Sequence, residues 1–206
     1  MSQVENGNVS FPIEHVPGER RSNIAIMLPG QDVRKVGMFD EIIQHPEGLE
    51  VMQRGNEFMK KEYGTDIVAL ATATGDPDTD AANALTLRET RNTQPAVYLL
   101  SAGLHNVNKA LGKRGYATTP SYYSGNSMGM GTAASLAGFM DFNTAMRFHA
   151  ERGRLMQEFG DQQPTSMIGL LRMKEGQVLK LLGEIENESI DLCLINSDEF
   201  GCRRSK

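Results

Sequence analysis

Apolar residues along this chain form short continuous runs in some places and follow helical spacing in others, a pattern typical of domains that mix parallel strands with helices. Residues 23–28 form an apolar run closed by Pro29-Gly30, which predicts a strand buried in a parallel sheet and a turn after it. Residues 121–124 predict a second strand that leads directly into Gly125. The expected fold class is therefore α/β, with a parallel sheet flanked by helices.

Helical spacing of apolar residues dominates the rest of the chain. Because proline is tolerated in a first turn, Thr93-Gln94-Pro95 predicts the start of a helix with a broad apolar face. Asp141 is a predicted N-cap, and the helix after it carries His149 and Arg152 on one apolar stripe. Further helices are expected at 38–45, 49–61 and 128–139, and a loop at 75–80.

The chain divides into three segments by composition. Residues 1–22 are rich in Glu, Asn, Gly and Pro, so we expect a flexible leader without an export signal. Residues 23–160 hold the predicted sheet and its helices and form the expected large α/β subdomain. Within residues 161–206 the pattern predicts a strand at 167–173, a helix at 176–186, a strand at 190–195 and then a polar tail.

Composition narrows the function classes. The 206 residues are 39% hydrophobic and 23% charged, as in a soluble globular domain, and no apolar run is long enough to span a membrane. A net charge of -5 argues against nucleic-acid binding. Cys193 and Cys202 form no C-x-x-C pair and have no histidine cluster near them, so we expect no metal site and a cytoplasmic location.

The stretch Gly125-Asn126-Ser127-Met128-Gly129 has the pattern G-x-S-x-G, between a predicted strand and a predicted helix of small residues. A serine on such a turn is strained and exposes its hydroxyl, and the flanking glycines remove side chains that would clash there. The N–H of Met128, at the start of the helix, can bind a developing oxyanion. Ser127 is therefore a predicted nucleophile, the alternative being a turn with a purely structural role.

Four motifs together resemble the malonyl/acyl-CoA:acyl carrier protein acyltransferases of fatty-acid and polyketide synthesis. In chain order, these motifs are Pro29-Gly30-Gln31, Thr93-Gln94-Pro95-Ala96, Gly125-Asn126-Ser127-Met128-Gly129 and Arg152-Gly153-Arg154-Leu155-Met156-Gln157. The resemblance covers residues 23–197. It implies a three-layer acyltransferase/hydrolase-like fold, with part of a ferredoxin-like small subdomain in 161–206.

The resemblance also implies a reaction and roles for single residues. Ser127 would take a malonyl or related acyl group from CoA and pass it to the phosphopantetheine thiol of acyl carrier protein. Gln31 and the Met128 N–H would lie near the oxyanion. Arg152 would pair with the malonyl carboxylate, for which a planar guanidinium is suited, and Gln94 would lie near the site. CoA thioester is then the substrate, and no cofactor or metal is expected.

This chain departs from the family pattern at the serine turn and near the acyl site. Asn126 stands where the family has histidine, and Met130 where it has glutamate. Asp32 follows Pro29-Gly30-Gln31 in place of glycine, so its carboxylate would repel an anionic acyl donor.

The family's serine-activating histidine lies far downstream, and the expectation is that this chain, which ends at Lys206, is C-terminally truncated before it. None of the four histidines of the chain matches that position; they are His15, His45, His105 and His149.

Three functions stay open from the sequence. The first is acyl transfer through Ser127. The second is a non-catalytic fragment that binds acyl-CoA, carrier protein or a full-length partner, because a serine without its base is a poor nucleophile. The third is a serine thioesterase or hydrolase, although Arg152 argues against it. Missing strands would leave an apolar sheet edge, which favours self-association or pairing with a complementing chain.

Overall fold

The computed structural model describes residues 4–5, 8–9, 24–113, 120–162, 170, 173–185 and 190. Backbone contacts divide the chain into two units, Met1–Gln163 and Pro164–Lys206. Nearly all of the predicted strands at 167–173 and 190–195, the polar tail and both cysteines lie outside the described residues. Of the predicted leader, only β1 (Val4–Glu5) and β2 (Asn8–Val9) are described, and they pair antiparallel.

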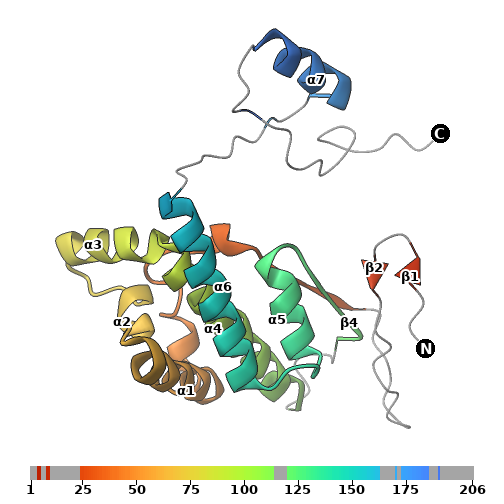
Figure 1. The fold of residues 1–206 in the computed structure, drawn as a ribbon. Helices are drawn as coiled ribbons and strands as arrows, with labels where there is room; N and C mark the ends of the chain where they lie inside the picture. Colours follow the sequence, from red (N-terminus) through yellow and green to blue (C-terminus); the bar gives the residue numbers. More distant parts are fainter. Residues whose placement is uncertain are drawn as a thin grey trace. The chain divides into compact units, whose positions relative to one another are not determined.

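In its described ranges, the first unit also contains two strands, two 3-10 helices and six α-helices (Figure 1). In chain order they are β3 (Ala25–Leu28), η1 (Gln31–Val33), η2 (Ile42–Gln44), α1 (Pro46–Tyr63), α2 (Ile67–Ala71), α3 (Pro77–Arg88), α4 (Thr90–Lys113), β4 (Tyr122–Gly125), α5 (Met128–Leu136) and α6 (Phe142–Gln162).

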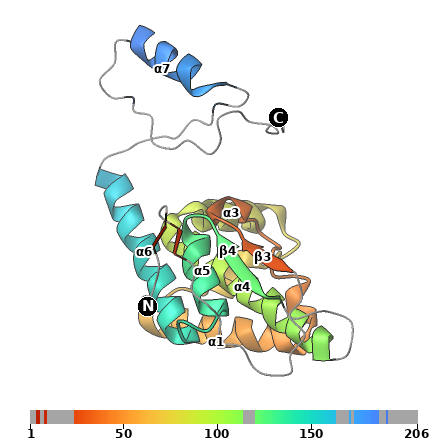
Figure 2. The same ribbon diagram turned by 90° about the vertical axis from the view of Figure 1, so that its right-hand side faces the viewer.

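β3 and β4 form a parallel pair, which confirms the predicted α/β class (Figure 2). Their register sets Leu28 opposite Gly125, so both strands end at the same level. The turn after β3 and the serine turn after β4 therefore leave the sheet at one edge. Since ligands in open α/β sheets bind beyond the carboxyl ends of the strands, this edge is where a site is expected.

The prediction that the first strand is buried was wrong for most of its length. Leu28 is buried, whereas Met27 is 72% exposed. Within the described ranges the sheet has two strands, and β3 pairs along one edge with β4. A strand is fully buried only when layers cover both of its faces.

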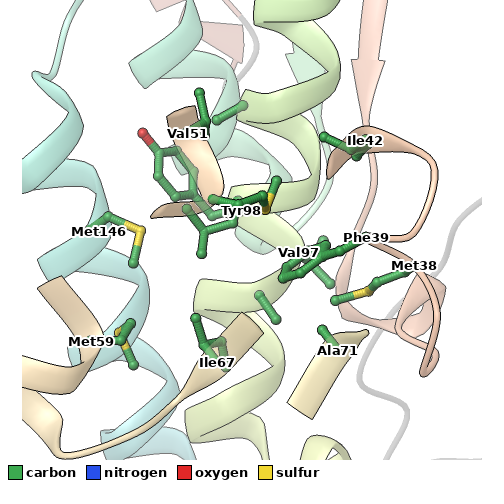
Figure 3. Close-up of a cluster of buried hydrophobic side chains, with 14 of the residues drawn as sticks. Met38, Phe39, Ile42, Val51, Met59, Ile67, Ala71, Val97, Tyr98 and Met146 are labelled. Carbon is green, nitrogen blue, oxygen red and sulfur yellow. The ribbon is translucent and has the colours of Figure 1, made fainter. Parts of the chain in front are cut away.

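The core lies around α4, which packs against α1, α5 and α6. Tyr98 and Leu99 of α4 are almost completely buried, as are Met52 of α1 and Met146 of α6. Figure 3 shows Val97 and Tyr98 among side chains from α1, α2, α6 and the segment before α1. This packing holds α4 and α6 beside each other, and both helices carry predicted site residues.

Local capping explains where several helices begin and end. α1 begins at Pro46 and ends at Tyr63, and Gly64 follows it with a positive φ of 68°, which is typical of a glycine that terminates a helix. The predicted N-cap Asp141 is confirmed, because its Oδ1 accepts from the N–H groups of Asn143 and Thr144 at 2.9 and 3.0 Å.

Three local predictions need correction. Residues 38–45 form turns and the short helix η2. The expected loop at 75–80 contains the start of α3, because the Asp76 carboxylate caps the Thr79 N–H at 3.0 Å. α4 begins at Thr90, so Pro95 lies inside the helix. The side-chain hydroxyl of Thr93 and amide of Asn92 donate to carbonyls of α3, which stabilises this earlier start.

The second unit is described mainly over α7 (Glu175–Glu184), which confirms the predicted helix at 176–186. Its first turn is capped by Gln177, whose Oε1 accepts from the Lys174 N–H at 2.9 Å. In the parts of the chain that the structure describes, no helix combines the length and apolar character needed to cross a membrane.

Candidate active site

Ser127 occupies the turn between β4 and α5 in a strained backbone conformation. Its φ of 54° and ψ of -121° make it the one non-glycine residue with positive φ among those the structure describes. L-residues rarely adopt this region, and such strain of about 1–3 kcal/mol persists where the surrounding structure enforces it. The side chain is exposed, so the strain presents the hydroxyl to solvent as a strand–serine–helix elbow does.

The two glycines of the motif are required by close backbone approach. A Cβ on Gly125 would lie 2.3 Å from the carbonyl of Gly129. A Cβ on Gly129 would lie 2.5 Å from the carbonyl oxygen of Leu28 at the end of β3. Any larger residue at these positions would push the serine turn away from the sheet, so the motif is explained by packing as well as by its pattern.

The Arg152 side chain reaches from α6 to the serine turn. Its Nη2 donates to the Ser127 Oγ at 3.1 Å, and its Nη1 donates to the Gln94 Oε1 of α4 at 2.7 Å. Gln94 is completely buried, and its Nε2 in turn donates to the Met156 Sδ at 3.2 Å. The structure therefore brings together Ser127, Arg152 and Gln94, three residues that were predicted to share a site.

Gln31 and Met128 lie at the two strand ends that frame the site. Gln31 begins η1 after β3, and its Oε1 accepts from the Thr90 Oγ1 at 3.4 Å. Met128 is fully buried as the first residue of α5, where backbone N–H groups have no acceptor within the helix. Gln31 makes no hydrogen bond to Ser127 within the described residues, so its place near the oxyanion stays a prediction.

Asp32 lies on the surface next to Gln31. Its side chain is 98% exposed, and its carboxylate is 3.7 Å from the Arg34 guanidinium. Because solvent and this neighbouring cation screen the carboxylate, its repulsion of an anionic donor is weaker than the sequence suggested.

His149 and Thr132 form a buried polar pair that the sequence analysis did not identify. The His149 Nε2 lies 3.3 Å from the Thr132 Oγ1, and the imidazole ring stacks on Tyr98 with centroids 4.9 Å apart. Burial, together with the nearby Arg152 charge, lowers the pKa of His149 from 6.5 to about 3. The helical spacing of His149 and Arg152 was the available signal, because residues three apart share a helix face.

No histidine among the described residues forms a hydrogen bond to Ser127. The neutral ring of His149 is turned to Thr132, and Arg152 has no lone pair that can accept a proton. The described residues also contain no cluster of three or more His, Cys, Asp or Glu side chains that could hold a metal ion. The arrangement can orient an acyl group and a carboxylate, but activation of the serine needs a base from elsewhere.

We predict that Gly129→Ala destabilises the protein, because the added methyl group would overlap the Leu28 carbonyl oxygen. Gly160→Ala is the matched control, since a Cβ there meets no atom within 4 Å in a helix, where alanine is favoured by about 0.5–1 kcal/mol. Urea unfolding should show a loss of stability for the first variant and a small gain for the second. Equal stability of the two variants would contradict the packing described for the serine turn.

We predict that stability falls as the pH is lowered from 6.5 towards 3 because His149 is buried as the neutral ring. Below 6.5 the unfolded chain binds a proton that the folded chain does not bind, so the free energy of unfolding decreases by up to about 1.4 kcal/mol per pH unit from this residue. His149→Gln removes the titrating group and should make the decrease shallower. Parallel pH profiles for both proteins, measured by denaturant unfolding, would contradict this.

Comparison with known proteins supports the motif-based resemblance, although no family model matches the chain. The malonyl CoA-acyl carrier protein transacylase of Escherichia coli K12 is 27% identical over 164 residues, covering 79% of this chain and 48% of that protein. The crystal structure of the Synechocystis sp. PCC 6803 malonyl-CoA:ACP transacylase matches with a TM-score of 0.60 at 26% identity, covering 79% of this chain and 48% of that one.

A third similar structure is a type II polyketide-synthase acyl carrier protein in complex with its malonyl transacylase, with a TM-score of 0.51 and 28% identity. That match covers 66% of this chain and 40% of the solved chain. The chain thus spans about half the length of the curated relatives it matches. In both sequence and fold it is similar to the malonyl CoA-acyl carrier protein transacylases, which confirms the family resemblance that its four motifs predicted.

Proposed function

We propose that this protein carries the acyl-binding part of a malonyl transferase, in which Ser127 accepts an acyl group from CoA and passes it to acyl carrier protein. The observation that carries the proposal is the contact between the Arg152 guanidinium and the Ser127 hydroxyl. A fixed cation next to a strained, exposed serine is suited to an acyl group that itself bears a carboxylate.

The first half-reaction requires a small number of groups around Ser127. The serine oxygen attacks the thioester carbonyl, the C–O bond forms, and the C–S bond breaks as the thiol of CoA leaves with a proton. Charge develops on the carbonyl oxygen, and the N–H of Met128 at the start of α5 is the candidate donor, with Gln31 at the start of η1 as the second. In the second half-reaction the phosphopantetheine thiol attacks the serine ester, the C–S bond forms, the C–O bond to Ser127 breaks, and the serine oxygen regains a proton.

Selection of a carboxylated acyl group follows from how Arg152 is held. Gln94 is fully buried and binds Nη1 at 2.7 Å, so the guanidinium cannot swing away from the serine without leaving a buried amide oxygen unpaired. The other terminal nitrogen, Nη2, lies next to the Ser127 hydroxyl to which the acyl group would be attached. A malonyl ester can pair its carboxylate with this nitrogen, whereas an acetyl ester leaves the charge without a partner.

The serine proton needs an acceptor, which the described residues do not place at Ser127. In the family that the chain resembles, the acceptor is a histidine, and we propose that full transfer requires a histidine from outside the described residues. A protein without that base would hold acyl-CoA and react slowly, because loss of the histidine in a serine triad lowers kcat by up to about a million-fold.

CoA thioester enters this proposal as the substrate, and no further cofactor is included. The E. coli relative is named a transacylase between malonyl-CoA and acyl carrier protein, which supports acyl carrier protein as the acceptor. One similar structure contains a polyketide-synthase carrier protein, so the proposal includes both fatty-acid and polyketide synthesis as pathways for this reaction. We place the reaction in the cytoplasm as part of the same proposal.

We predict that malonyl-CoA leaves a malonyl adduct on Ser127, detected by intact-protein mass spectrometry. Ser127→Ala should abolish the adduct. Arg152→Ala should reduce malonyl labelling at least about 10-fold while changing acetyl labelling from acetyl-CoA much less, because a charge-assisted hydrogen bond contributes about 1.5–3 kcal/mol.

Two other outcomes would change the assignment. A folded protein that binds malonyl-CoA and gives no adduct would be a non-catalytic acyl-CoA binder. Hydrolysis of the thioester that persists in Arg152→Ala would indicate a serine thioesterase instead.

A further inference from the structure

His149 lies in the interior of the protein, one helical turn before Arg152 on α6. It has no exposed surface, stacks on Tyr98 at an interplanar angle of 23°, and meets the edge of Phe148 at a centroid distance of 5.2 Å. A Cβ on Gly131 would lie 3.2 Å from the His149 Cε1, so the ring lies directly against α5. The proposed catalytic steps do not use this side chain.

One hydrogen-bond path connects the ring to the start of α5. The His149 Nε2 lies 3.3 Å from the Thr132 Oγ1, and that hydroxyl donates to the Met128 carbonyl at 3.4 Å. When the threonine hydrogen is used for the carbonyl, the imidazole in its Nε2–H tautomer donates to the Thr132 hydroxyl. The path therefore ends on the residue that follows Ser127.

The hydrogen bonding of the two ring nitrogens suggests why a histidine occupies this position. Its Nδ1 is buried without a hydrogen-bond partner among the described residues, a cost that an apolar side chain of similar size would avoid. The feature that an apolar residue would lack is the Nε2 hydrogen bond to Thr132.

α6 thus contacts the serine turn at two points one turn apart. The first point is the path from His149 to Met128, and the second is the hydrogen bond from Arg152 to Ser127. Apolar packing against α4 already holds α6 in the core. Directional hydrogen bonds add to this packing by fixing the rotation of α6 relative to α5 more closely. Arg152 has a long, flexible side chain, so the position of its guanidinium relative to Ser127 depends on the position of the α6 backbone.

We propose that His149 is a positioning residue: through Thr132 it holds α6 against the first turn of α5 and thereby sets the distance between the Arg152 guanidinium and the Ser127 hydroxyl. The effect of this contact on acyl selection rests on the proposed function. Its effect on the structure of the serine turn is independent of that function.

The test compares Thr132→Val, which removes the hydroxyl at nearly constant volume, with Thr132→Ser, which keeps it. The first readout is amide hydrogen exchange by NMR at Gly129 and Met130, whose N–H groups bond to the carbonyls of Asn126 and Ser127 in the serine turn. Exchange there should be about 5- to 10-fold faster in Thr132→Val and unchanged in Thr132→Ser, as expected for loss of one buried hydrogen bond. The Ala137 amide, at the other end of α5, is the internal reference.

The second readout is the ratio of malonyl to acetyl labelling of Ser127. Thr132→Val should lower this ratio about 5-fold or more because the backbone of α6, and with it Arg152, is then less closely fixed relative to Ser127, although Gln94 still binds the guanidinium. Thr132→Ser should keep the wild-type ratio. His149→Leu should reproduce the valine variant, and the double variant should add nothing, since both changes break the same path.

Each result decides the proposal. Unchanged exchange at Gly129 and Met130 in Thr132→Val would overturn it, whether or not the protein is active. Faster exchange with an unchanged labelling ratio would overturn the positioning of Arg152 and leave His149 a structural residue. Absence of any adduct on the wild-type protein would refute the proposed function instead, and the exchange data would then decide the role of His149 in the serine turn.

Discussion

The Arg152 guanidinium binds the Gln94 amide oxygen of α4 and the Ser127 hydroxyl of the serine turn at the same time, and the organisation of the site depends on this pair of hydrogen bonds. A buried glutamine fixes one nitrogen, so the charge is aimed before any ligand arrives. Preorganised charges of this kind stabilise a bound anion without reorganisation when it binds. The core around α4 supports the arrangement, because it holds α6 alongside.

The same charge also constrains its surroundings. His149 lies one turn from Arg152 and is buried, and both burial and the guanidinium oppose a second positive charge, so the ring stays neutral over the physiological pH range. Its neutral form can donate to Thr132 without competing with Arg152 for an anionic ligand. Among the described residues, Arg152 is the cation that binds the serine hydroxyl, as the proposed selection of a carboxylated acyl group requires.

Sequence reasoning was most successful where a residue's role follows from local backbone geometry. The strand, the serine turn and the following helix were predicted because G-x-S-x-G is required by close backbone approach, and the structure shows that approach at Gly125 and Gly129. The apolar stripe on α6 predicted that Arg152 faces inward, and its half-buried side chain reaches the Ser127 hydroxyl. These features depend on short-range spacing, which is visible in one chain.

Features set by contacts between distant segments were not predictable in the same way. The early start of α4 depends on side chains of Asn92 and Thr93 that bind carbonyls of α3, and the exposure of β3 depends on which strands lie beside it. The pairing of His149 with Thr132 joins α6 to α5. A helical stripe shows that a histidine faces inward, but only the packing of the two helices shows its partner.

The proposed selectivity of Arg152 for a carboxylated acyl group can be measured by calorimetric binding of CoA thioesters to Ser127→Ala, because no chemistry follows binding in this variant. We expect malonyl-CoA to bind at least about 10-fold more tightly than acetyl-CoA, as one charge-assisted hydrogen bond would provide. Equal affinity for the two thioesters would contradict it.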